Sequence, residues 1–138
     1  MKRTLSFLFL AFAAATMSMT AQNLQVTVKS SADCTNLSVE FTVPAGKTAK
    51  LMSMDIIPSF TTCNASQPAP TTNYASVAEK GGNSAKSKGK IKYTKTVAHD
   101  GTITESDAIT TIKLGAGTYV LELSKAPNLE AKLVYQLF

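Results

Sequence analysis

The chain has 138 residues and a formal net charge of +5, from 14 Lys and Arg against 9 Asp and Glu. Arg3 is its only arginine, and it contains no tryptophan. Because arginine is the side chain best suited to bidentate contacts with phosphates and guanine edges, this composition argues against nucleic-acid binding.

Residues 1–21 have the pattern of a secretory signal peptide. Two basic residues precede an apolar run from Leu5 to Ala15, and small residues stand at a cleavage site before Gln22. A run of about a dozen residues is shorter than the roughly 20 that a membrane-spanning helix needs, so a retained anchor is disfavoured. We expect cleavage after Ala21, which leaves residues 22–138 as one domain with a net charge of +3.

Cys34 and Cys63 are the only two cysteines. In an exported protein an even pair indicates a disulfide, which would close a loop of about 30 residues and stabilise the fold by ~3 kcal/mol. The alternative is a reactive thiol, which needs a nearby base, and the only histidine, His99, is remote in the sequence. The residue at the cleavage site is Gln22 and not a cysteine, so we expect no lipid anchor there.

Alternation of apolar and polar residues predicts the first strands. The pattern runs through Leu24–Lys29 and again through Leu37–Val43. A third strand is predicted over Lys50–Ile57, and Pro58 ends it because proline cannot donate to a sheet ladder.

Residues 59–89 change in character, being rich in Thr, Asn, Ser, Ala, Pro and Gly. We predict a long loop, which in a compact domain usually means function or disorder. Within it, Asn73–Glu79 could form a short edge strand.

Strand character returns in the last third of the chain. An Asp100-Gly101 hairpin turn is expected, with Thr102–Thr104 leading out of it. The predicted strands are Lys90–Val97, Ile109–Leu114, Thr118–Leu123 and Ala131–Phe138. About seven short strands with Gly and Pro turns predict an all-β fold, either an antiparallel sandwich or a small barrel.

The C-terminal third also carries a resemblance. A Gly-x-Tyr strand at Gly117–Tyr119 is followed by a turn and the final strand Lys132-Leu-Val-Tyr-Gln136. This arrangement resembles immunoglobulin-like modules of secreted Bacteroidota proteins, in particular the C-terminal sorting domains of the type IX secretion system. The resemblance implies an immunoglobulin-like sandwich and that export route. The Asn-Pro-Ala motif of such domains is absent, Leu137-Phe138 extend past their usual end, and no functional residue is carried over.

Four lysines at a spacing of two are the most conspicuous polar feature, and we name them the lysine strip: Lys86, Lys88, Lys90 and Lys92. In an extended strand their ammonium groups would line one face and could bind an acidic glycan, an anionic surface or an acidic patch of a protein. The alternative is an edge strand whose lysines deter pairing with other chains.

Catalytic and metal-binding signals are weak. His99, Asp100, Glu105 and Asp107 could gather around one hairpin, but their spacing matches no calcium loop, and turn chemistry explains Asp100-Gly101. No nucleophile elbow, zinc-protease motif or phosphate-binding loop is present. We therefore expect no enzyme, no metal and no cofactor.

The interpretation is a secreted or periplasmic, non-catalytic binding module for adhesion or envelope interaction, whose partner is a protein or an acidic glycan. The alternative is a secreted proteinase inhibitor that presents the 59–89 loop. Membrane insertion as an outer-membrane barrel is disfavoured, because counting back by twos from Phe138 gives Gln136, Val134 and Lys132, too polar for a lipid face.

Overall fold

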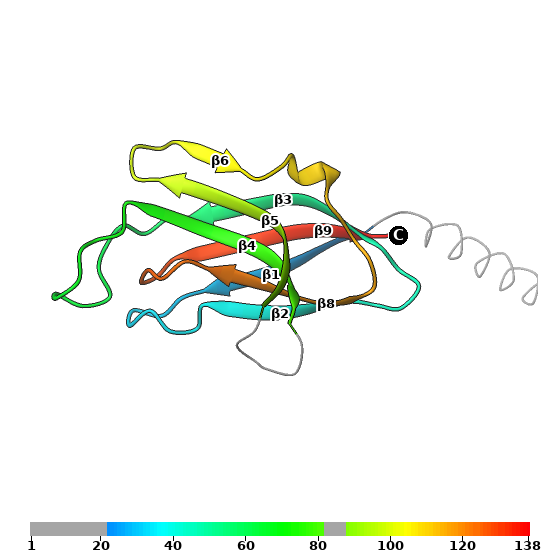
Figure 1. The fold of residues 1–138 in the computed structure, drawn as a ribbon, viewed down its shortest axis with the longest axis horizontal. Helices are drawn as coiled ribbons and strands as arrows, with labels where there is room; N and C mark the ends of the chain where they lie inside the picture. The colour runs from blue at the N-terminus through cyan, green and yellow to red at the C-terminus, as the bar shows by residue number, and fades with distance from the viewer. Residues whose placement is uncertain (1–21, 82–87) are drawn as a thin grey trace, which may run out of the picture.

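The computed structural model describes residues 22–81 and 88–138, apart from the side chain of Lys88 (Figure 1). Within these ranges the chain forms nine strands and one short 3-10 turn, η1. The elements are β1 Asn23–Lys29, β2 Ser38–Val43, β3 Ala49–Ile57, β4 Thr72–Lys80, β5 Lys88–Ala98, β6 Ile103–Glu105, η1 Ile109–Thr111, β7 Lys113–Leu114, β8 Gly117–Leu123 and β9 Glu130–Leu137.

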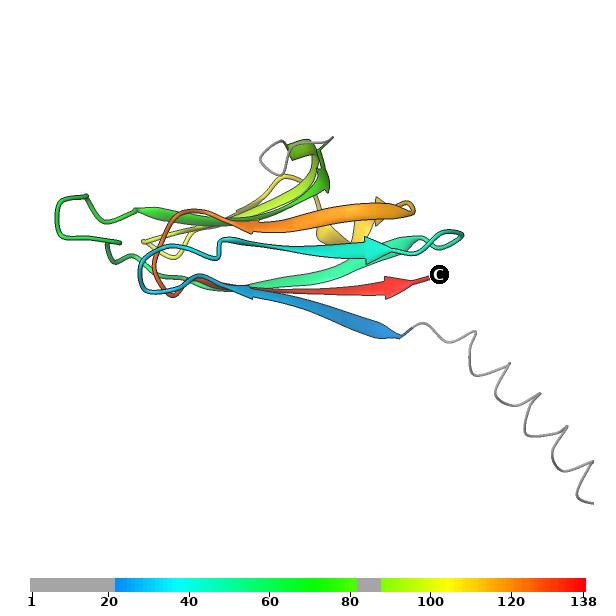
Figure 2. The same cartoon turned by 90° about the horizontal axis from the view of Figure 1, so that it is seen from below.

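The strands form two sheets that pack face to face (Figure 2). One sheet has the order β1-β9-β3-β7, and the other has the order β2-β8-β4-β5-β6. Every pairing is antiparallel. The predicted all-β antiparallel sandwich is therefore confirmed, with nine strands in place of about seven.

The order of the strands is that of a jelly roll. The first half of the chain pairs with the second half in reverse, so that β1 pairs with β9, β2 with β8, β3 with β7 and β4 with β5. Such a pattern is a long hairpin rolled into two sheets. In immunoglobulin domains the first two strands are neighbours in one sheet, whereas here β1, β2 and β3 alternate between the sheets. The chain shares the sandwich architecture of those domains but not their strand order.

The prediction of a single long loop over residues 59–89 is wrong. Residues Thr72–Lys80 form β4, which lies between β8 and β5 and is not an edge strand. Its buried side chains are mostly small, and they include Ala75, Val77 and Ala78. A central strand lined with small residues has the composition of a loop, which explains the error. The true β3–β4 loop covers residues 58–71.

The predicted strand Ile109–Leu114 is also divided. Ile109–Thr111 forms η1, and only Lys113–Leu114 extend as β7. The Thr111 hydroxyl donates to the carbonyl oxygen of Ala108 at 2.6 Å, and the Thr111 amide donates to the same oxygen at 3.0 Å. Such local bonds offer the backbone an alternative to a sheet ladder. Conversely, the segment after the Asp100-Gly101 turn forms β6, a strand paired with β5.

The core lies between the sheets and is built from every second residue of the strands. Its fully buried larger apolar side chains are Val43, Leu51, Met54, Val77, Tyr93, Leu114, Leu121, Leu123, Leu129 and Leu133. The alternation of β9 shows the rule, since Ala131, Leu133 and Tyr135 are buried and the residues between them are not fully buried. This agreement between period and burial is why the sequence pattern located most strands.

Cys34 and Cys63 form the predicted disulfide, with their Cα atoms 5.6 Å apart. It joins the β1–β2 loop to the β3–β4 loop at one end of the sandwich, which we call the disulfide end. A disulfide is compatible with a location outside the cytoplasm. In the part of the chain that the structure covers, no helix is long and apolar enough to cross a membrane.

The other half of the sandwich, which we call the lysine end, holds the β2–β3 turn, β7 and Phe138 at its tip, and the ends of β4 and β5 that face each other lie nearer the middle of the molecule (Figure 1). These separate segments share this half of the sandwich, because alternate connections of a jelly roll lie toward the same end of the strands. The lysine end carries Lys47, Lys50, Lys80, Lys90, Lys92 and Lys113.

Candidate binding surface

Three members of the lysine strip, Lys88, Lys90 and Lys92, belong to the first half of β5. Lys86 lies outside the described residues, as does the side chain of Lys88. Lys90 is exposed and Lys92 is half-buried. In this half, β5 has β4 on one side, while β6 pairs only with Lys95–Val97.

Two irregularities in β5 break the alternation on which a single cationic face depends. Tyr93 lies opposite Val77 and Ile91 lies opposite Ala78, so Lys92 is an extra residue, and a second shift follows before Lys88. A bulge changes the face to which the following side chains point. The evenly spaced lysines of the sequence therefore do not form one regular row.

Gly89 allows the two strands to approach closely at the second irregularity. A Cβ atom at Gly89 would lie 2.9 Å from the Cβ atom of Glu79 and 3.1 Å from its carbonyl oxygen. Contacts below 3.0 Å are not tolerated between real side chains, so a larger residue would force the strands apart. The shape of this cationic hairpin depends on that glycine.

Carboxylates neutralise part of the strip and its neighbour Lys80. The Nζ atom of Lys92 lies 2.9 Å from a carboxylate oxygen of Glu79. The hydrogen bond and charge of Lys92, together with the nearby Lys90, hold the pKa of Glu79 below its usual value. Because both side chains are partly exposed to solvent, such a pair contributes little to stability.

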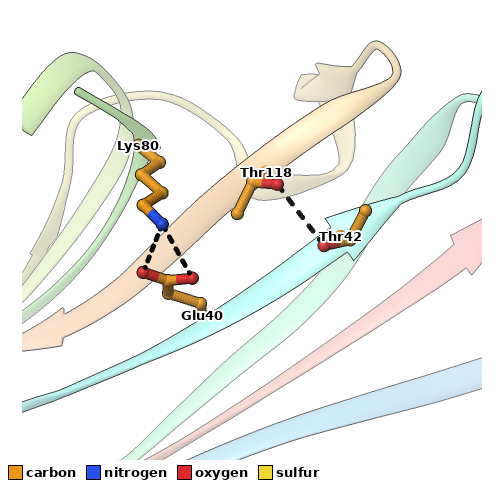
Figure 3. Close-up of polar contacts among 4 residues, drawn as sticks. All are labelled: Glu40, Thr42, Lys80 and Thr118. Carbon is orange, nitrogen blue, oxygen red and sulfur yellow. Dashed lines mark hydrogen bonds and ion pairs between the residues drawn. The ribbon is translucent and has the colours of Figure 1, made fainter. Parts of the chain in front are cut away.

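A second ion pair crosses the outer face of the five-stranded sheet. Figure 3 shows Lys80 on β4 reaching toward Glu40 on β2, with Nζ 3.1 Å and 3.3 Å from the two carboxylate oxygens. Thr42 and Thr118 face each other beside this pair, with their hydroxyl oxygens 3.5 Å apart. This face is polar and exposed to solvent, and Lys80 is paired there with Glu40.

Lys95, which flanks the strip, points the other way. Its Nζ donates to the carbonyl oxygen of Met54 in the opposite sheet at 2.6 Å. That part of β3 pairs only with β9, because β7 reaches no further than Lys50. Lys95 therefore satisfies a carbonyl on a free sheet edge and is not available to a partner.

The lysine end also has a hollow of about 470 Å³, which the sequence did not predict. It is lined by Thr48, Lys50, Lys113 and Phe138. Lys50 and Lys113 lie directly opposite each other across β3 and β7. The sequence carries no signal for this pairing, because the two lysines are far apart in the chain and meet only through the jelly-roll connection.

The residues considered for calcium take other roles. Asp100 accepts a bond from the Thr102 amide at 2.9 Å, and Gly101 has the positive φ of a tight turn. His99 packs edge-on against Phe60, with ring centroids 4.9 Å apart. Glu105 accepts the hydroxyl of Tyr93, and burial together with this carboxylate raises the pKa of Tyr93. Within residues 22–81 and 88–138, no group of three or more His, Cys, Asp or Glu is arranged to hold a metal.

No family model matches this chain, and neither a curated protein nor a solved structure is significantly similar to it. The function must therefore be argued from the chain's own geometry.

Proposed function

We propose that this chain is an exported, non-catalytic binding module that attaches through its lysine end to an acidic glycan of a cell envelope or surface. Export rests on the signal predicted at residues 1–21, and the C-terminal resemblance suggests the type IX route. The disulfide is compatible with this location.

The observation that supports this proposal most is that lysines from separate chain segments lie in the half of the sandwich away from the disulfide (Figure 1). Lys47 and Lys50 come from the β2–β3 region, Lys90 from β5 and Lys113 from β7. At the opposite end, the β3–β4 loop, residues 58–71, has no charged residue. Such an asymmetric positive surface attracts anionic partners and does so less strongly as salt rises.

The test is retention of the processed protein on an immobilised acidic polysaccharide, compared with a neutral one of the same backbone. The variant Lys86→Gln/Lys88→Gln/Lys90→Gln removes three strip charges and spares Lys92, which is paired with Glu79. The matched control Lys29→Gln/Lys125→Gln/Lys132→Gln removes three charges elsewhere. We expect elution of the first variant at clearly lower salt and a smaller change in the control.

Equal losses in both variants would reduce the binding to net charge and contradict the proposal. Self-association of the strip variant with unchanged retention would instead assign the strip to edge protection, since that half of β5 has only β4 as a neighbour. Size-exclusion chromatography of the same samples separates these results.

The disulfide end supports a second candidate function, proteinase inhibition. The disulfide tethers the β3–β4 loop at Cys63, and the following residues 64–69 are exposed. Asn64 shapes the loop by accepting bonds from the amide and hydroxyl of Ser66 at 3.1 Å and 2.6 Å. Incubation with a protease panel decides this candidate: rapid cleavage within residues 58–71 without inhibition eliminates it.

A further inference from the structure

The hollow at the lysine end is framed by three adjacent strands. Lys50 belongs to β3, Lys113 belongs to β7, and Phe138 directly follows β9. β3 is hydrogen-bonded to both of the other strands. The lining side chains are thus held by one continuous piece of sheet.

The backbone around the hollow is well fixed. Thr48 and Phe138 exchange two backbone hydrogen bonds, of 3.0 Å and 2.8 Å. The amide of Leu51 donates to the carbonyl oxygen of Ile112 at 3.1 Å. The neighbouring Ala49, Leu51 and Leu114 are fully buried. A site on a rigid element of this kind holds its side chains ready for a ligand.

The two lysines create an electrostatic cost that a ligand could remove. Directly opposite residues of an antiparallel pair have Cβ atoms about 5 Å apart, and like charges there are unfavourable. Among the described residues, neither Lys50 nor Lys113 forms an ion pair with a carboxylate. An anionic group placed between the two ammonium groups would turn this repulsion into two charge-assisted hydrogen bonds.

Phe138 adds an apolar surface beside the cations. The residue is 58% exposed although its backbone is tied to Thr48. A simple inorganic anion would use the lysines and leave this ring unused. The hollow, at about 470 Å³, has the volume of a small-molecule pocket and exceeds the needs of one inorganic anion.

We propose that this hollow binds one acidic sugar unit, with its carboxylate or sulfate between Lys50 and Lys113 and its C–H face against Phe138. The inference builds on the proposed function by naming the ligand class and a subsite apart from the lysine strip. Cations and an apolar ring side by side match a sugar that is charged on one side and apolar on a ring face.

The experiment is a titration of the ¹⁵N-labelled processed protein with digalacturonic acid, galactose 6-sulfate, inorganic sulfate and a neutral galactose disaccharide, followed by amide chemical shifts. We expect saturable shifts around Lys50, Lys113 and Phe138 with one or both acidic sugars, weaker ones with sulfate and none with the neutral sugar. The two acidic probes show whether a carboxylate or a sulfate is preferred.

Two variants test the assigned roles. Lys113→Gln should lower the affinity for the preferred acidic sugar about ten-fold, consistent with the loss of one charge-assisted bond. Phe138→Ala should lower the affinity for that sugar but leave the weaker affinity for sulfate unchanged. The control Lys132→Gln, on the outer face of β9, should leave both affinities unchanged. Chemical shifts of core amides confirm that each variant is folded.

Absence of saturable shifts with both acidic sugars would overturn the inference, as would equal effects of Lys113→Gln and Lys132→Gln. An affinity for sugar that survives Phe138→Ala would overturn the role of the ring. If the acidic sugar binds the hollow but the protein is not retained on the acidic polysaccharide, the subsite stands and the proposed attachment to a glycan surface fails.

Discussion

The two ends of the sandwich differ in how their residues are used. At the disulfide end, Cys34 is bonded to Cys63, and the hydroxyl of the buried Ser30 donates to Ala126 and accepts from the amide of Leu129. At the lysine end, Lys50 and Lys113 face each other without an ion pair to any described carboxylate. The polar groups named at the disulfide end are satisfied within the fold, whereas these two lysines are the groups that we propose bind a ligand. We therefore expect that stability and binding can be changed separately.

The largest expected effect on stability comes from the disulfide. Cys34→Ala/Cys63→Ala should lower the free energy of unfolding by about 3 kcal/mol, because the bond restricts the unfolded chain over a sequence separation of 29 residues. Urea denaturation without reductant measures the loss. Retention of the folded variant on acidic polysaccharide should be unchanged, and a variant as stable as the parent would contradict this assignment.

A smaller loss is expected from Ser30→Ala. The side chain is 1% exposed, and its hydroxyl bonds Ala126 at 2.6 Å and the Leu129 amide at 2.9 Å. Removing it leaves a buried amide without this partner, which costs about 2 kcal/mol. The matched control is Ser38→Ala, at an exposed position, which should change stability by no more than about 0.5 kcal/mol. Equal midpoints for the two variants in denaturant would refute the role of Ser30.

Stability should also decrease at alkaline pH. Burial and the nearby Glu105 raise the pKa of Tyr93, so the folded state keeps its proton where the unfolded chain loses it. The stabilisation is therefore complete below the unfolded pKa of about 10 and is lost as the pH rises above it. Burial raises the pKa of Tyr135 in the same direction.

Unfolding measured between pH 8 and pH 11 tests this dependence. Tyr93→Phe should reduce the slope above pH 10 and leave the part due to Tyr135. A slope that is the same in Tyr93→Phe and in the parent would show that Tyr93 does not cause it.

The smallest effect on stability is expected at the lysine end. Lys113→Gln removes one of two directly opposed charges, so stability should rise by about 0.3 kcal/mol at low salt. The gain should disappear at high salt because the repulsion is screened. Lys132→Gln is the comparison: its backbone pairs in register with Asp55, so its removal should lower stability slightly. A loss above 1 kcal/mol in Lys113→Gln would mean that this lysine supports the fold.

Much of the sandwich could be predicted because burial follows a period of two. In β2 the buried side chains are Phe41 and Val43, which the sequence pattern placed on one face. The disulfide was predictable from the even cysteine count in an exported chain. β4 was not recognised as a central strand, because small side chains such as Ala75 and Ala78 fill a tight space that composition does not reveal.

The candidate site was predictable only in part. The lysine strip is visible as a spacing, but the irregularities of β5 depend on its contact with β4 at Gly89 and Glu79, which the sequence does not show. The hollow needs the pairing of β3 with β7, a consequence of the jelly-roll order. The alternation of apolar and polar residues indicates which face of a strand is buried. It does not indicate which distant strand lies beside it.

The most direct test of the central claim maps an acidic oligosaccharide onto the two ends of the ¹⁵N-labelled processed protein. The account predicts that amide shift changes concentrate in residues 44–50, 88–92 and 113–114 and at Phe138, and that the β3–β4 loop, residues 58–71, is unaffected. Changes centred on the β3–β4 loop, or spread evenly over both ends, would contradict the account.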